Sequence, residues 1–475
     1  MQSEEAAWAQ EEFETLQTGD RRRARRLVNM AARAAERPAG KVSEVFSRDK
    51  ERQGAYDLLE GGKVSADAVL LAMGDATAVR AAAEGVAYVA IDGASITLTD
   101  RNKSKDFGRV GNQDSLRGLK VINALGLSPQ GVPLGLFTQV WWARPPAPIR
   151  TGSKKARRAQ KSKFKRQRGT EEKETRYWLQ AIEQSTARAE ETGAQLWFQL
   201  DREADCQAIL MKLTDSNHQF TVRGSWNRLI EDADEEGQHL LEALGKRAPQ
   251  GVYEIDVPAG PQRTARRARM VTRWGQVVLR MGSARGSERL LEINVVWTRE
   301  QRTCPAGEKP LDWLLLTSAE VRSLEAAREV IFGYTLRWRI ESFHKTWKTG
   351  ACNVEDAQLR SPHAVTLWAT LLAAVATRIE RLKLLSRSEP EKPASAELDS
   401  YEIRALILLK REQKKKTELV PDTMPTIAQA TRWIADLGGY TGKSSGGPPG
   451  SITIRRGLDY LRPAAQLLRQ LQAEN

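Results

Sequence analysis

YTLRWRIESFHKTWK, residues 334–348, is the segment of this sequence that is most informative about its fold. Its apolar residues recur three and four positions apart, which predicts a helix. At about 100° per residue, five polar side chains fall within about 80° of one helical face: Tyr334, Arg337, Glu341, Lys345 and Lys348. Cations on either side of a carboxylate can hold successive phosphates of a nucleic acid around a reacting bond. The alternative is an amphipathic helix whose polar face is basic.

Two aspartates far upstream follow predicted strands. Asp92 ends the apolar run VAYVAID, and Asp201 comes directly after AQLWFQL. Strand ends that lie side by side, next to the helix of Glu341, would bring three carboxylates together. Such a cluster cannot stay ionised without cations among its members, and hard cations such as Mg²⁺ or Mn²⁺ prefer carboxylate oxygens. We therefore expect Asp92, Asp201 and Glu341 to be catalytic and to hold two Mg²⁺ ions, with Mn²⁺ as a substitute.

The cysteines, the histidines and the apolar segments indicate the cellular setting and bear on metal binding. The three cysteines form no CxxC pair, so a reducing, cytoplasmic setting is expected rather than a disulfide framework or a zinc ribbon: Cys206, Cys304 and Cys352. Three scattered histidines are not expected to bind metal: His218, His239 and His363. The acidic start MQSEEAAWAQEEFE predicts no secretory signal. The apolar run at 364–377 is too short to cross a bilayer, and no membrane partner is expected.

The charge balance points to a polyanionic partner. Of 475 residues, 74 are Lys or Arg and 60 are Asp or Glu, which gives a formal net charge of +14. Basic clusters at 21–26, 154–168 and 410–416 predict a long contact track rather than one small pocket. The second cluster is expected to form a flexible loop. The first predicts a helix that lies along a phosphate backbone, with a solvated face as the alternative, through three residues: Arg22, Arg23 and Arg26.

The order of predicted elements indicates an α/β core between two helical regions. Residues 1–80 show helical periodicity. The runs VAYVAID and SITLT, then LKVINALGL and GLFTQVWWA around a turn, then a helix, AQLWFQL and a second helix give the order β-β-β-α-β-α. Short strands fill 218–318, helices follow at 323–348 and 364–380, and a linker lies near residue 390. The C-terminal helices are expected at 426–437 and 454–473, with Pro463 kinking or dividing the second.

The opening stretch also carries a family resemblance. Tyr334, Arg337, Glu341 and Lys348 match the Y-x2-R-x3-E-x6-K signature of bacterial DDE transposases of the insertion-sequence-four family. The sequence resembles the transposon-five type most, because AID around Asp92 and four further segments also match: DREAD at 201–205, WWARP at 141–145, WLLLTS at 313–318 and QGAY at 53–56. The resemblance covers roughly residues 15–352. Gly93-Ala94 stands where relatives carry hydroxyl side chains, which bears on local DNA contacts rather than on metal binding.

The resemblance implies a fold and a domain organisation. It implies an RNase H-like catalytic core at 81–385 with a β-strand insertion at about 218–318. A helical DNA-end-binding domain would occupy 1–80, and a helical dimerisation module would occupy 386–475. The active form would be a homodimer on double-stranded DNA, in the bacterial cytoplasm and on the nucleoid when acting.

The resemblance also implies a reaction. A cut-and-paste transposase binds the element ends, cleaves them by two-metal hydrolysis through a DNA hairpin, and joins the 3′-OH ends to target DNA. Tyr334, Arg337, Lys345 and Lys348 would hold DNA phosphates, and Trp313 would stack on a flipped base unless it is a core tryptophan. The alternatives are another RNase H-like nuclease and a catalytically silent DNA-binding regulator derived from a transposase.

Overall fold

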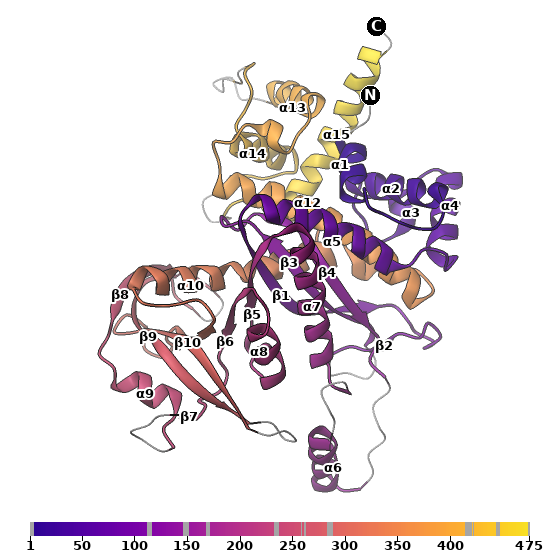
Figure 1. The fold of residues 1–475 in the computed structure, drawn as a ribbon. Coiled ribbons are helices and arrows are strands. Elements are labelled where there is room, and N and C mark those ends of the chain that lie inside the picture. Colours follow the sequence, from indigo (N-terminus) through magenta and orange to yellow (C-terminus); the bar gives the residue numbers. More distant parts are fainter. Residues whose placement is uncertain are drawn as a thin grey trace.

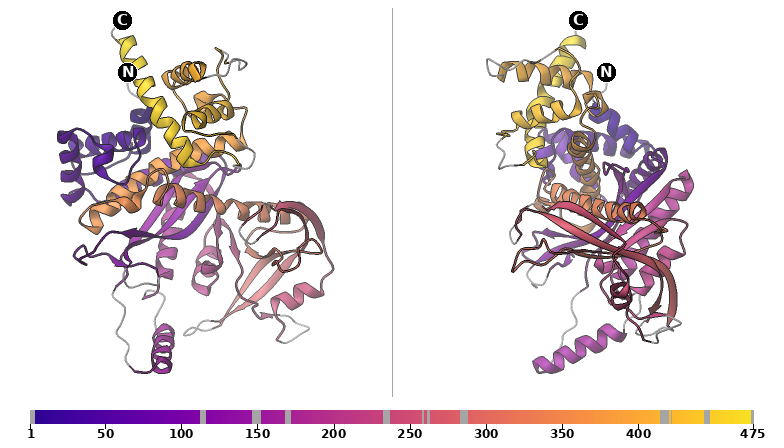
Figure 2. Two further views of the ribbon diagram at one scale, coloured as in Figure 1. Left: turned by 180° about the vertical axis from the view of Figure 1, so that it is seen from behind. Right: turned by 90° about the vertical axis from the view of Figure 1, so that its left-hand side faces the viewer.

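A computed structural model of the 475-residue chain shows the arrangement of its elements (Figure 1). The structure describes residues 4–111, 116–145, 152–167, 172–231, 237–257, 259–260, 263–282, 288–413, 420, 422–442 and 447–473. A mixed sheet with helices on both faces lies beneath two helical regions, one from each end of the chain (Figures 1 and 2). In the part of the chain that is described, none of the helices combines the length and the apolar character that crossing a bilayer requires.

The N-terminal region is helical, as predicted. Its helices are α1 (Glu4–Glu12), α2 (Arg21–Glu36), α3 (Val42–Val45), α4 (Asp49–Glu60) and α5 (Ala66–Ala83). Helix α2 begins where the Asp20 side chain accepts from the backbone N–H of Arg22. Thr77 of α5 donates a hydrogen bond of 3.2 Å to the carbonyl of Leu136. Helix α5 therefore lies directly against the sheet, whereas α2 to α4 stand farther from it (Figure 1).

The predicted β-β-β-α-β-α order is confirmed except for two additions, a two-residue strand at 108–109 and a helix at 154–167. The core strands are β1 (Val86–Leu98), the two-residue β2 (Gly108–Arg109), β3 (Arg117–Leu127), β4 (Pro133–Trp142), β5 (Gln195–Leu200) and β6 (Gln219–Arg223). Strand β1 pairs antiparallel with β3 and parallel with β5. The expectation that the first strand ends at Asp92 is wrong, because Gly93-Ala94-Ser95 continues the ladder to β3. The two predicted runs are one strand, and Asp92 lies in its middle.

The β-rich segment extends the core sheet. It contains β7 (Ile230–Glu231), α9 (Leu240–Lys246), β8 (Gly251–Val257), β9 (Arg266–Met281), β10 (Arg289–Glu300) and β11 (Asp312–Thr317). Among the described residues, one sheet of eleven strands runs in the order β2-β3-β1-β5-β6-β11-β10-β9-β7, with β4 beside β3 and β8 beside β9. The run QFTVR, expected to open the insertion, is β6 and pairs parallel with β5. It therefore belongs to the core.

Helices cover the two faces of the core sheet. One face packs on α7 (Thr175–Thr192) and α8 (Gln207–Thr214), and the other on α10 (Leu324–Leu336), α11 (Trp338–Lys348) and α12 (Pro362–Ser388). In β1, Val89 and Ile91 face the first group, and Ala90 faces the second. Because successive side chains of a strand alternate, Asp92 shares the face of Ala90. This places its carboxylate on the side of α11.

The C-terminal region is helical, as predicted, and consists of α13 (Ser400–Gln413), α14 (Ile427–Leu437) and α15 (Ser451–Ala473). Thr426 and Gln429 form a capping box at the start of α14. Of the two effects expected of Pro463, a kink or a division of the last helix, division is wrong, because α15 is continuous through it. Leu461 and Ala465 on either side are buried in the C-terminal core, and this packing offsets the backbone hydrogen bond that proline lacks.

Two basic clusters differ from their predictions. Residues 154–167 form helix α6 (Lys154–Gln167) rather than a loop. Lysine, arginine, alanine and glutamine are good helix formers, and the Ser153 hydroxyl accepts from the N–H of Ala156 at the first turn. In the third cluster, Lys410 is buried and lies 2.9 Å from Asp436, so it does not face solvent. Residues 414–416 lie outside the described residues.

Candidate active site

Two neighbouring strands and one helix position the three predicted carboxylates. The pairing between β1 and β5 ends at Ile91 and Leu200. Asp92 and Asp201 are therefore the next residues on two adjacent parallel strands. Asp201 also caps a short helical turn by accepting from the N–H of Glu203 at 2.8 Å. Glu341 lies in the first turn of α11, and its carboxylate comes within 4.8 Å of that of Asp92. The three residues thus converge at the edge where β5 ends.

Arg337 lies between two of these carboxylates. It is only 6% exposed, and its Nη1 donates to Oδ2 of Asp92 at 3.1 Å. The same guanidinium reaches Oε1 of Glu341 at 3.3 Å through Nη2. The helical projection of the sequence predicted that Arg337 lies on a basic face that binds phosphates. In the structure it is buried and neutralises the acidic cluster, which the one-helix projection could not show.

The electrostatics of Asp92 indicate a site for cations. Burial raises the pKa of Asp92 to about 7, repulsion by Asp201 and Glu341 adds to the rise, and Arg337 opposes it. A carboxylate with such a raised pKa is stabilised in its charged form by a nearby cation. Clustered carboxylate oxygens suit hard divalent cations, so the donor set fits the ions expected from the sequence.

His344 joins this cluster, and sequence reasoning did not assign it a role. One of its ring nitrogens lies within 4.8 Å of ligand atoms of Asp92 and Glu341. Its Nε2 is 3.0 Å from Nδ2 of Asn123, whose Oδ1 accepts from Nε2 of Gln139 at 2.6 Å. Burial lowers the pKa of His344 to about 3, with Lys348 and Arg337 adding to the effect. The ring is therefore neutral. In the sequence, the signal that could have indicated a role for His344 was its position one helical turn after Glu341.

The predicted aromatic contacts lie beside the cluster. Tyr334 is buried, and its ring meets that of Trp313 edge to face, with centroids 6.1 Å apart. Trp313, on β11, is half-buried. Trp313 therefore packs against the core and also remains partly accessible to solvent.

The predicted cations differ in exposure. Lys345 is exposed on α11, whereas Lys348 is half-buried and lies 3.6 Å from Glu355. On α2, Arg22 and Arg26 are exposed, and Arg23 lies 3.9 Å from Asp20. The α2 arginines are far along the chain from the carboxylates and belong to a separate helical region (Figure 1).

Two exposed tryptophans near the carboxylates were missed. Trp338 is 57% exposed, with the guanidinium of Arg337 5.2 Å from its ring centroid. Trp226 is 64% exposed, and its backbone N–H donates to Asp205, four positions after Asp201. Sequence reasoning treats tryptophan as a core residue unless a motif marks it. Exposed aromatic rings at such a site are suited to stack on nucleic-acid bases.

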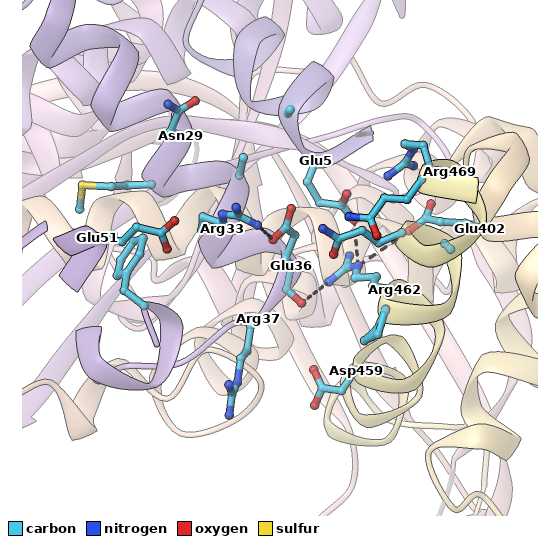
Figure 3. Close-up of a pocket in the computed structure, with 18 of the residues that line it drawn as sticks. Glu5, Asn29, Arg33, Glu36, Arg37, Glu51, Glu402, Asp459, Arg462 and Arg469 are labelled. Atoms are coloured by element: carbon cyan, nitrogen blue, oxygen red, sulfur yellow. Dashed lines mark hydrogen bonds and ion pairs between the residues drawn. The ribbon is translucent and has the colours of Figure 1, made fainter. Parts of the chain in front are cut away.

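A cavity of about 1330 Å³ lies elsewhere, between the two helical regions (Figure 3). Arg462 of α15 projects into it and lies 2.9 Å from Oε1 of Glu5. Its Nη1 also donates to the carbonyls of Ala35 and Glu36 at the end of α2. Those carbonyls carry the partial negative charge of a helix C-terminus. The cavity contains none of the three carboxylates, so it is a junction of the chain ends rather than the active site.

Comparison with known proteins finds transposase families along most of the chain. Residues 5–64 match a family described as transposase DNA-binding, residues 144–378 match a transposase DDE domain, and residues 374–466 match the transposase Tn5 dimerisation domain. Among solved structures, a piggyBac transposase synaptic complex with hairpin DNA is similar at 11% identity and a TM-score of 0.28. That match covers 64% of this chain and 48% of the other, so the chain spans about half the length of that relative.

Proposed function

This chain belongs to the Tn5-type DDE transposases, with an RNase H-like catalytic core, and on that premise we propose that it moves a DNA element by cutting and joining. The observation that carries the proposal is the convergence of Asp92, Asp201 and Glu341 from two strands and a helix. The substrates are the two ends of the element and a target duplex. The protein acts as a homodimer in the bacterial cytoplasm, on nucleoid DNA.

Asp92, Asp201 and Glu341 would hold the divalent cations beside the reacting phosphodiester. Two Mg²⁺ ions bound there, or Mn²⁺ in their place, would stabilise charge on the attacking and leaving oxygens. Water attacks the phosphorus at the element end, the bond to the 3′ oxygen breaks, and that oxygen leaves as a 3′-OH. Arg337, Lys345 and Lys348 then hold phosphates around the cleaved end, Arg337 from its buried position beside Asp92.

The freed 3′-OH reacts again at the same site. Its attack on the opposite strand closes a hairpin and releases the flanking DNA, water reopens the hairpin, and a last attack joins the end to target DNA. The tight bend of a hairpin requires one base to leave the stack. The half-exposed ring of Trp313, supported edge-on by Tyr334, is suited to receive that base.

The chain ends serve binding and assembly. Arg22, Arg23 and Arg26 on α2 contact the phosphates of the element end within the region that matches a transposase DNA-binding domain. The C-terminal helices pair two protomers, because one carboxylate cluster per chain must serve two ends.

A joining assay tests the proposal. The short inverted repeats in the DNA that flanks the gene define the element ends, and a marker between two such ends is mixed with a second plasmid. We expect Mg²⁺-dependent transfer of the marker into that plasmid. Cleavage without joining would indicate an ordinary RNase H-like nuclease, and end binding without cleavage would indicate a silent regulator.

A further inference from the structure

Helix α6 is a basic arm that lies outside the catalytic cluster. It contains five lysines and three arginines in the sequence KKARRAQKSKFKRQ and no acidic residue. Lys154, Lys155, Arg157 and Arg158 are all exposed. The arm projects from the core on the side opposite to the N-terminal and C-terminal helices (Figures 1 and 2).

The base of the arm is built onto the sheet. Arg144, after β4, forms a two-pronged ion pair with Glu174, which precedes α7, and Lys120 lies 3.0 Å from the same carboxylate. Although burial raises it, Arg144 and Lys120 lower the pKa of Glu174 to about 2, so the pair stays charged. The rings of Trp142 and Tyr177 stack beside it with centroids 4.0 Å apart. The arm therefore leaves the core from a fixed point.

That fixed point lies at the catalytic edge. Strands β1 and β4 are both antiparallel to β3, and β1 is parallel to β5, so β1, β4 and β5 run in one direction. Asn123 of β3 pairs with both Asp92 and Gln139, which puts Gln139 level with the catalytic centre. The chain leaves β4 three residues later, at the same edge where Asp201 follows β5.

The composition of α6 requires an anionic partner. Phe164 is its only large apolar residue, so it lacks the apolar face that packs a helix onto a protein surface. Like charges four positions apart, such as Lys154 and Arg158, oppose an isolated helix. A helix of this length spans about 21 Å, enough to follow several phosphates of one duplex.

We propose that α6 captures the target DNA by contacting its phosphate backbone beside the active site. The inference rests on the proposed function. The flanking DNA is covalently joined to an end that the protein already holds, so its effective concentration is high without further contacts. A target duplex arrives as a separate molecule of any sequence and needs its own affinity, which a sequence-independent basic helix supplies.

The test uses two variants of the full chain with matched positions. In the neutral variant, Lys154, Lys155, Arg157 and Arg158 are all changed to Gln, which keeps helix propensity. In the charge-preserving control, the two lysines become Arg and the two arginines become Lys. Joining of a precut end to a plasmid, nicking of an uncut end, and anisotropy of a random-sequence duplex are measured at several salt concentrations.

We expect the neutral variant to join at least about tenfold more slowly at 0.1 M salt and to nick within about twofold of wild type. Its slope of log K against log salt on the random duplex should fall by up to about 3.6, at about 0.9 per lost contact. The control should behave as wild type in all three assays. Joining at the wild-type rate would overturn the proposal. A loss of nicking as large as the loss of joining would overturn it too, and would indicate that α6 binds the flanking DNA instead. If wild-type protein neither nicks nor joins, the proposed function fails, and an unchanged salt slope then also rules out α6 as a DNA contact.

Discussion

Nη1 of Arg337 lies 3.1 Å from Oδ2 of Asp92, although 245 positions separate the two residues in sequence. The pair joins the residue between α10 and α11 to the middle of β1. A buried guanidinium therefore provides positive charge for the carboxylate cluster. Under the proposed function, the same side chain would also hold a phosphate of the substrate.

Arg337→Ala should slow both nicking and hairpin formation by about ten- to a hundredfold. A hydrogen bond to a charged group contributes about 1.5–3 kcal/mol, and each 1.36 kcal/mol is tenfold in rate. Arg337→Lys keeps one charge and should fall between the variant and wild type. The measurement is a single-turnover time course for each step. A loss confined to one of the two steps would contradict a phosphate-holding role throughout the reaction.

The raised pKa of Asp92 makes the stability of the metal-free protein depend on pH. Its pKa rises from 3.8 to about 7, mainly through burial, so between these values the folded protein holds a proton that the unfolded chain has lost. The stability from this group is complete below pH 3.8 and is lost as pH rises through 7. Urea midpoints in EDTA should show wild type losing stability relative to Asp92→Asn between pH 5 and 8. Parallel curves for the two proteins would show that Asp92 ionises normally.

Trp313→Ala should spare the first nick and slow hairpin formation by about one to two orders of magnitude. Stacking on an aromatic ring is worth about 1–3 kcal/mol per base, and the nick needs no flipped base. Trp313→Phe retains an aromatic surface against Tyr334 and serves as the control. If Trp313→Ala leaves the hairpin rate unchanged, the residue acts only in packing.

Exposed apolar side chains on α15 should mediate pairing of the protomers. Tyr460, Leu467 and Leu471 are 67%, 57% and 50% exposed. Changing Leu467 and Leu471 to Glu should reduce the bridging of two end duplexes by two protomers in sedimentation, while binding of a single end is kept. Arg456→Gln, at another exposed position of α15, is the matched control. Point substitutions are preferred to a deletion of residues 440–475, because the deletion would also remove the contact of Arg462 with the end of α2.

The order of the core elements was largely predictable because it depends on local patterns, and the three carboxylates selected from the sequence do converge in the structure. Alternating and helical periodicities give the elements, and a signature with fixed spacing marks Glu341. The continuity of β1 through Gly93-Ala94 was not predictable, because it depends on pairing with β3 rather than on local propensity. Helix α6 was missed for a different reason, since a dense run of charge resembles a loop when its partner is unknown.

The burial of residues 334–348, which form the end of α10 and all of α11, also could not be predicted from the sequence. A helical projection shows which residues share a face, but not that Tyr334 and Arg337 face the sheet while Lys345 faces solvent. His344 contacts Asn123, which in turn accepts a hydrogen bond from Gln139, so these contacts join three separate elements and no local pattern reports them. Such contacts appear only when the tertiary structure is known.

Cleavage of an end-labelled duplex, resolved on a denaturing gel, tests whether the three carboxylates form one metal-dependent catalytic site. Asp92→Ala, Asp201→Ala and Glu341→Ala are compared with wild type in Mg²⁺, in Mn²⁺ and in EDTA, and Asp215→Ala changes an exposed carboxylate at the end of α8 as a control. The account predicts that wild type and the control nick the end only with metal, and that the three variants bind the end in a gel shift without nicking it. Nicking at a near wild-type rate by any of the three variants would contradict the assignment of one metal-dependent site to these carboxylates.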